Sequence, residues 1–493
     1  MIQNKKILFL AVFSAFLNFY GKAQPQSLYH FGSITQRYYL NPAFQPWCNV
    51  YVGMPGINSL YIAGGNNAVS LNNFIYLEGS KMTTIFDSGV SKTPLINAFK
   101  PANIIFSNIS LGIIDFGFRF GKDFYFTYDL SLKENISFGF PKEFAQLLIE
   151  GNAPGTSDGM VIPLKHFGFR EEAYLEHAFG LSKEISPELT IGGRLKIIHG
   201  LFNITTNTNK ASLQAYDSSW YYNKPMYAYA SVPVAGAWVK DMSGGVSLTQ
   251  EFEDNPEKYL QDHLTAGSLF KNMGLGMDLG MDYRPSDLWS LSASIVDLGF
   301  IHWNNTTSAR MTTRQDSAFK GVYLTPEIVD DARGRALIAR ATLDTLRDLL
   351  LNQFQKNSGE LQGYTTFLTW KFYAGASYFL WPEKLSIGLL SRTEMYYKHV
   401  YERITVSANF FPARFWSATA SYTFLNNTFS NMGIGMNFKL GPLNLYLIGD
   451  YWPLVYGKQF IPYQSRMINA QLGMNLLFGC GKRIKDRPMI SAY

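Results

Sequence analysis

The seven histidines are the side chains of this chain best suited to bind a metal ion or to act as a catalytic base. A zinc site or a nucleophile with its base requires such residues to converge. No two histidines lie at ligand spacing, no His-Glu-x-x-His motif occurs, and no Ser lies in a Gly-x-Ser-x-Gly turn. We therefore expect no catalytic residue, no metal ligand and no cofactor. The histidines, interpreted as polar structural or loop residues, are His30, His166, His177, His199, His263, His302 and His399.

Acidic residues are the second group that could bind a metal ion. A dense cluster at Glu251, Glu253, Asp254 and Glu257 has enough carboxylates for calcium, but it lacks the regular spacing and the glycine of known calcium loops. A solvated loop is the better interpretation of this cluster. Other acids stand alone in long segments that otherwise avoid charge, and they are Asp278, Asp282, Asp297 and Asp450.

The segments around the isolated acids alternate between apolar residues and small or polar residues. Residues 272–283 read N-M-G-L-G-M-D-L-G-M-D-Y, and the alternation returns over residues 431–440 and 466–478. A β-strand sends successive side chains to opposite faces, so each segment has one apolar and one polar face. Strands of soluble sandwiches are typically about 5–6 residues long, whereas a transmembrane barrel needs about 9–11 residues per strand. The pattern predicts an antiparallel transmembrane β-barrel.

Such a barrel would hold the isolated acids inside it. A carboxylate that faces lipid is costly, so these acids should face the lumen or lie at its rim. Four basic residues occupy the polar faces of their own strands, and ion pairs in the lumen are the simplest interpretation. The lumen would be either a closed, salt-bridged interior or a selective pathway. The candidate lumen residues are Asp278, Asp282, Asp297, Arg119, Arg194, Lys196 and Lys439.

Composition agrees with a large barrel. The chain has 493 residues, of which 47% are apolar and only 16% charged, and it contains 38 Phe, 30 Tyr and 9 Trp. Aromatic girdles at two membrane interfaces would use these rings. A secreted, aromatic-rich soluble β-domain is the alternative, because β-propensity alone would allow it.

The N-terminus predicts export from the cytoplasm. Lys5 and Lys6 precede an apolar run and then Gly21-Lys22-Ala23, the order of a cleaved signal peptide. Removing residues 1–23, which hold three Lys and no acid, lowers the formal charge from +6 to +3, too little to indicate nucleic acid. The expected parts are a signal peptide (1–23), a periplasmic strap or lumen plug (24–47), an outer-membrane barrel (48–480) and a periplasmic tail (481–493). Cys48 and Cys480 are the only thiols, and the sequence does not say whether they pair.

Alternation and turn residues together predict about fourteen strands. Short turns alternate with longer connections, as in outer-membrane barrels, whose periplasmic turns are short and outer loops long. The predicted strands are 50–61, 108–120, 124–136, 174–182, 189–204, 272–283, 289–303, 364–380, 385–396, 402–411, 415–425, 431–440, 443–452 and 466–478.

Two long connections contain helical patterns. Residues 304–363 include an amphipathic stretch whose apolar face carries Ala339, Leu343, Leu346, Leu350 and Phe354. Residues 141–150 predict a second, short helix. An outer-loop helix either caps the mouth of the barrel or packs within its loop, and both interpretations stay open.

Strand and turn patterns recur in segments 41–43, 276–285, 292–299 with Trp303, 433–436, 441–446 with Asp450, and 475–479. These segments look like an uncharacterised family of outer-membrane β-barrels from Bacteroidetes, a domain of unknown function. The resemblance covers nearly the whole mature chain and implies fold rather than chemistry. The architecture also resembles the long-chain fatty-acid transporter family, with fourteen strands and an N-terminal plug, and the barrel partners of type IX secretion.

Two functions from different classes follow as hypotheses. The first is uptake of a hydrophobic small molecule across the outer membrane by a non-enzymatic barrel. The second is a scaffold or partner subunit for surface-protein secretion and envelope assembly, and an outer-membrane hydrolase is a remote third. The expected partners are outer-membrane lipid together with a hydrophobic ligand or a secretion or envelope protein, and no nucleic acid. A lumen tunnel lined by Phe, Leu and Met and opening sideways would favour uptake, whereas a fully blocked lumen with a flat, apolar outer-loop surface would favour the scaffold.

Overall fold

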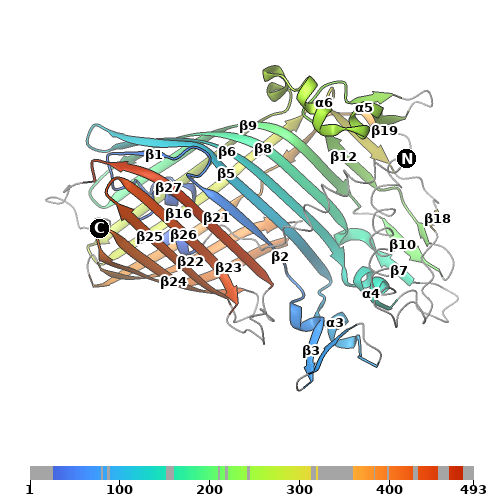
Figure 1. The fold of residues 1–493 in the computed structure, drawn as a ribbon, viewed down its shortest axis with the longest axis horizontal. Helices are drawn as coiled ribbons and strands as arrows, with labels where there is room; N and C mark the ends of the chain where they lie inside the picture. Colours follow the sequence, from blue (N-terminus) through green and yellow to red (C-terminus); the bar gives the residue numbers. More distant parts are fainter. Residues whose placement is uncertain are drawn as a thin grey trace.

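A closed antiparallel barrel dominates the computed structural model of this chain (Figure 1). The structure describes residues 26–78, 81–85, 89–150, 160–208, 211–216, 220–240, 245–312, 318–319, 359–381, 384–396, 399–425, 431–453 and 466–480. The wall consists of β1 (Val50–Gly53), β2 (Leu60–Asn66), β5 (Ala102–Phe120), β6 (Phe124–Pro141), β8 (Gly168–Glu184), β9 (Leu189–Asn207), β15 (Met273–Ser286), β16 (Trp289–Trp303), β20 (Tyr364–Phe367), β21 (Lys371–Trp381), β22 (Leu385–Tyr396), β23 (His399–Ala413), β24 (Trp416–Leu425), β25 (Asn431–Leu440), β26 (Leu443–Pro453) and β27 (Met467–Phe478).

Two wall positions are each shared by a pair of short strands. β1 and β2 both pair with β27 and β5, and β20 and β21 both pair with β16. Counting each pair once gives 14 wall strands, which confirms the predicted fold class. The continuous strands predicted over 50–61 and 364–380 are wrong, because residues 54–59, which include Pro55, and residues 368–370 leave the strand.

The alternation seen in the sequence corresponds to the two faces of the wall. Met277 is 39% exposed and Met436 is 44% exposed on the outside, whereas Asp278 is fully buried on the inside. An apolar outer face and a polar inner face are what a strand between lipid and a lumen requires. None of the described helices is long and apolar enough to cross a membrane.

Among the β-bulges of the described wall, three each bring an aspartate into the lumen. Ile113 is the extra residue in β5, after which Asp115 faces inward. Val296 and Asp297 together lie opposite Asp278, and Asp297 has a positive φ of 60°. Asp450 and Tyr451 share a similar bulge in β26, and both side chains are buried. A bulge reverses the facing of later residues, so it can re-aim a chosen side chain.

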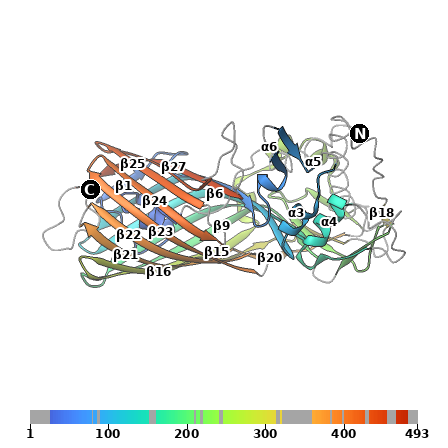
Figure 2. The same cartoon turned by 90° about the horizontal axis from the view of Figure 1, so that it is seen from below.

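The two ends of the barrel differ. Short turns close one end, here the turn end, while long connections build a lobe at the other, the loop end (Figures 1 and 2). The helix predicted over 141–150 is confirmed as α4, and the helix predicted around Leu343 lies outside the described residues. The lobe contains η2 (Leu71–Asn73), β3 (Ile75–Glu78), β4 (Lys81–Thr84), α3 (Thr93–Ala98), α4 (Lys142–Glu150), β7 (Met160–Pro163), η3 (Leu164–His166), β10 (Ser212–Ala215), β11 (Trp220–Tyr222), β12 (Tyr227–Ser231), β13 (Trp238–Lys240), β14 (Val246–Leu248), α5 (Gln250–Asp254), α6 (Pro256–His263), η4 (Ala266–Phe270), β17 (Ser308–Thr312), β18 (Ala318–Phe319) and β19 (Gly359–Leu361).

Small apolar cores hold this lobe together. Phe144 and Leu147 of α4 pack with Ile162 of β7 and Leu213 of β10. The C-terminal end of β9 extends into the lobe. There it pairs with β12, which in turn pairs with β17. The lobe is therefore continuous with the wall on the β9 side. The acidic cluster at 251–257 lies on α5 and α6 of this lobe.

The N-terminal segment lies inside the barrel. It contains α2 (Gln26–His30) and η1 (Thr35–Tyr39), and α2 contacts strands β22 to β26. Leu28, Phe31 and Phe44 pack against lumen side chains that include Tyr373 and Ile448. We call residues 26–47 the plug. Its end is fixed by a disulfide between Cys48 and Cys480, which join the start of β1 to the end of β27.

The lipid-facing assignment predicts a depth-dependent cost for charge. We expect Met277→Arg and Met436→Arg to reduce the folded fraction, because each places a cation mid-strand against lipid at a cost of about 2–4 kcal/mol. Tyr283→Arg lies near a turn and should cost about 0–1 kcal/mol, while Met277→Leu is the volume control. The measurement is the fraction of protein that runs as a heat-modifiable band on unboiled gels. Equal loss at positions 277 and 283 would contradict the assignment.

Candidate functional site

A buried carboxylate, Asp115, anchors one part of the plug. It accepts hydrogen bonds from the hydroxyls of Tyr38, at 2.6 Å, and Tyr39, at 3.0 Å, and from Gln36 Nε2, at 3.1 Å, all in the plug. Tyr51 of the wall donates a fourth bond of 2.8 Å. Asp115 is 1% exposed, so these donors replace the water that its charge has lost.

A second carboxylate, Asp450, anchors the start of the plug. It accepts from the backbone N–H groups of Gln26 and Ser27 and from the Ser27 hydroxyl. Charge-assisted bonds of this kind are stronger than neutral ones. The two carboxylates thus fix the start of the plug, at Gln26 and Ser27, and its middle, at residues 36–39.

Beyond the Asp115 anchor, at Asn41 and Pro42, the backbone of the plug approaches the wall closely. The Asn41 side-chain amide donates a hydrogen bond of 3.0 Å to the carbonyl of Met281. A Cβ on Gly280 would lie 2.0 Å from Asn41 Oδ1, and one on Gly192 would lie 2.2 Å from the Pro42 carbonyl oxygen. Only glycine leaves room here, so the polar-face glycines of β9 and β15 create space for the Asn-Pro turn.

An ion-pair network lies beside the plug on strands β6 to β21. Lys196 Nζ is 2.7 Å from Asp278 and 2.5 Å from Asp297. Arg194 pairs with Asp129, and its NH1 lies 2.9 Å from the other oxygen of Asp278. Three further members of the network are Lys133, Glu176 and Lys371, and Lys133 pairs with Glu176 at 2.7 Å. Each buried charge in this network therefore has an opposite partner, as burial demands.

The network also touches the plug. The guanidinium of Arg194 lies 5.2 Å from the ring centre of Tyr38 and 5.4 Å from that of Tyr39. These are cation–π distances. The plug and the network therefore form one continuous polar layer across part of the lumen.

The remaining sequence-predicted residues lie nearer the turn end. Arg119 NH1 donates to Gln45 of the plug at 2.6 Å and lies 3.2 Å from Glu184. Asp282 pairs with Arg284 at 2.8 Å, outside the network. Lys439 lies 4.0 Å from the ring centre of Trp47 and makes no ion pair with a described residue. The helix-face residues Leu343, Leu346, Leu350 and Phe354 fall outside the described residues.

Sequence reasoning did not single out several charged residues of the lumen, including five that belong to the network or anchor the plug. These five are Asp115, Asp129, Lys133, Glu176 and Lys371. Asp129 and Lys133 share the parity of Thr127 and Ser131, so the alternation of β6 held a usable signal. Asp115 follows the consecutive pair Ile113-Ile114, which breaks alternation and marks the bulge.

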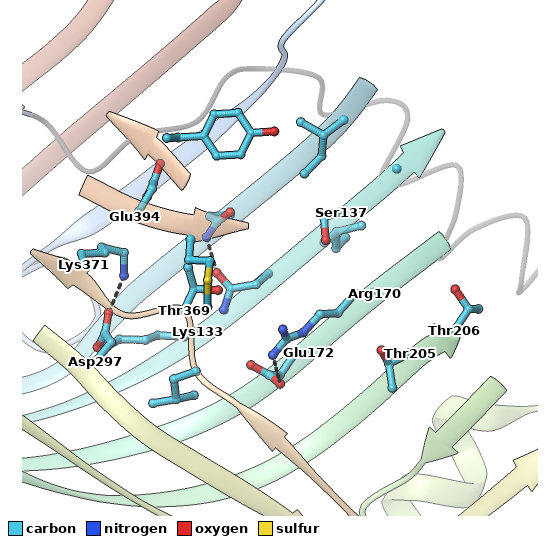
Figure 3. A pocket seen from close by; sticks show the side chains of 18 of the residues that line it. Lys133, Ser137, Arg170, Glu172, Thr205, Thr206, Asp297, Thr369, Lys371 and Glu394 are labelled. Carbon is cyan, nitrogen blue, oxygen red and sulfur yellow. Dashed lines mark hydrogen bonds and ion pairs between the residues drawn. The ribbon is translucent and has the colours of Figure 1, made fainter. Parts of the chain in front are cut away.

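An open cavity of about 920 Å³ lies above the network on the side of the loop end (Figure 3). Its floor includes Lys133, Asp297 and Lys371, and a side wall carries Arg170, whose NH2 lies 3.0 Å from Glu172. Apolar side chains such as Ile104, Leu368 and Met395 share the lining with many amide and hydroxyl groups. The volume suits one small-molecule ligand, and the mixed lining suits a molecule with polar and apolar parts.

These features define a class of protein, a transmembrane β-barrel with an internal plug and an outer cavity. The chain belongs to a family of unknown function, DUF5723, whose pattern matches residues 42–450. This agrees with the resemblance seen in the sequence. No curated protein matches the chain.

Solved structures with low similarity include two toluene transporters and one FadL homologue. The Ralstonia pickettii toluene transporter TbuX is 9% identical over 94% of this chain and 100% of its own, with a TM-score of 0.40. The Pseudomonas putida toluene transporter TodX is 9% identical over 92% and 99%, with a TM-score of 0.41. A Pseudomonas aeruginosa FadL homologue is 9% identical over 93% and 99%, with a TM-score of 0.39.

The network predicts unequal effects for two neutralised acids. Asp297→Asn removes the carboxylate that Lys196 and Lys371 share, and we expect it to lower the free energy of unfolding by about 3–5 kcal/mol. Glu360→Gln breaks the exposed pair with Arg310 and should cost less than about 1 kcal/mol. Urea unfolding followed by tryptophan fluorescence in detergent micelles measures both. Equal effects would show that the network contributes no special stability.

Proposed function

We propose that this protein is a plugged uptake barrel of the outer membrane that admits a small hydrophobic molecule with a polar end. The observation that carries the proposal is the cavity, which contacts residues on both faces of the wall. Thr365 and Met395 line it although both lie on the outward parity of their strands. Met395 is 41% exposed there, on the same face as Leu389.

The position of β20 explains how the cavity reaches the outward face. β20 pairs with β16 but with no strand on its other side among the described residues. Instead, the carbonyl of Phe367 accepts a 2.7 Å hydrogen bond from Nη2 of Arg170, which extends across the lumen from β8. Among the described residues, no ladder hydrogen bond joins β20 to β22. An apolar molecule in the outer leaflet would have a side route to the cavity here.

Passage further inward meets the network and the plug. A ligand would have to displace the plug, whose anchors are hydrogen bonds rather than covalent bonds except at Cys48. Movement of the plug about this fixed end would open the lumen and leave the wall intact. Export with removal of residues 1–23, and a periplasmic location for residues 481–493, belong to the same proposal.

A scaffold for envelope proteins is the second candidate, favoured by exposed apolar side chains on the lobe. Val161 is 56% exposed, Leu264 46% and Phe270 64%. If the amphipathic stretch predicted within residues 331–357 docks a partner, deleting these residues should release that partner in a pull-down and leave small-molecule uptake unchanged. If the stretch serves uptake instead, the same deletion should change uptake and release no partner.

The side route predicts a local sensitivity in β22. Met395→Trp places a large ring at the outward edge of the cavity, so we expect at least a five-fold slower uptake of a fluorescent fatty amphiphile by cells. Leu389→Trp is the matched control, because this side chain shares the outward face and does not line the cavity. Equal uptake rates for the two variants would contradict the proposed side route.

A separate experiment tests the plug. Deleting residues 24–47 should raise the permeability of reconstituted liposomes to small solutes, measured by swelling, because the wall alone leaves the lumen open. The control is Gln45→Ala, which keeps both anchors. Unchanged permeability after the deletion would mean that the wall or the lobe closes the lumen without the plug.

A further inference from the structure

The charged side chains that line the cavity are already paired. Arg170 forms an ion pair with Glu172, and Lys371 forms one with Asp297. Arg392 forms a third with Glu394, with 2.6 Å between nitrogen and oxygen. A charged ligand group would compete with partners that are already in place, and breaking a buried ion pair is costly. One lining cation, Lys165, makes no ion pair with a described residue, and it is exposed at the rim. The cavity therefore offers little unbalanced charge at its floor.

Uncharged polar groups, by contrast, have unused hydrogen-bonding capacity. The side chains of Ser110, Thr205 and Thr369 line the cavity and have no hydrogen-bond partner among the described residues. Asn108 donates to Asn135, but its own Oδ1 is buried without a partner. A buried acceptor without a donor is costly, so a ligand donor here would be favourable.

These groups surround the cavity rather than forming a single patch. Ser110 and Asn108 lie on β5, Thr205 on β9, and Thr369 follows β20, with Thr205 and Thr369 on separate walls in Figure 3. Two tyrosine rings also line the cavity, those of Tyr229 and Tyr364, and their centres lie 5.0 Å apart. Hydroxyl and amide groups on several sides, together with aromatic faces, complement a ligand that carries many hydroxyls.

We infer that the polar end of the transported molecule is an uncharged, hydroxyl-rich head of the sugar type. The head lies among Asn108, Ser110, Thr205 and Thr369, and the apolar chain points to the opening beside Met395. This inference rests on the uptake function proposed above and specifies its substrate class.

The test compares amphiphiles that share one chain and differ in the head. Decyl glucoside, decanoate and decylphosphocholine are titrated against the full mature protein in lipid nanodiscs, with empty nanodiscs subtracted. We expect decyl glucoside to bind at least ten-fold more tightly than the other two. Tighter binding of decanoate would overturn the inference and assign the head to Lys165 and the floor cations.

Substitutions then locate the binding. Thr205→Val and Thr369→Val keep the side-chain shape, and each should weaken decyl glucoside binding about five-fold, the loss of one uncharged hydrogen bond. Decanoate binding should not change. Thr393→Val is the matched control, because Thr393 of β22 does not line the cavity. Unchanged glucoside binding in both cavity variants would overturn the proposed head site.

The outcomes separate this inference from the uptake function. Equal binding of all three amphiphiles, reduced by Met395→Trp, would reject the sugar-type head and leave the uptake route standing. No binding of any of them would reject both.

Discussion

Burial of charge without water is the constraint on which the interior of this barrel depends. Asp115 loses nearly all contact with solvent and accepts hydrogen bonds from four donors, three of them from the plug. Removal of the plug would leave that carboxylate with Tyr51 alone. The plug thus stabilises the wall as much as the wall holds the plug, because neither set of groups is satisfied without the other.

Bulges are the means by which the wall supplies these charges. A strand with perfect alternation would have to place Asp297 on the lipid side, since Ser292 and Ser294 face inward. The bulge at Val296 and Asp297 lets both residues face the lumen and allows the Asp297 backbone N–H to donate 2.7 Å to Asp278. A local cost in backbone conformation is offset by the ion pairs it permits.

The sequence sufficed for the strands because two solvents impose a period of two on every long segment. The predicted strand at 289–303 and those at 385–396 and 431–440 have the bounds of β16, β22 and β25. Expecting the strand acids in the lumen required only the cost of charge in lipid. Contacts between residues far apart in the chain were not predicted, because alternation does not show which strands face each other across a lumen. Two such features are the hydrogen bond from Arg170 to the Phe367 carbonyl and the cavity above the network.

The bond between Cys48 and Cys480 makes residues 48–480 a covalent ring, with a sequence separation of 432. Cutting the ring once in any outer loop yields a single linked molecule of unchanged mass apart from one added water. Two fragments separate on a denaturing gel only after reduction. A protease cut in a loop-end connection therefore leaves every wall strand covalently attached. The disulfide keeps β1 joined to β27 after such a cut.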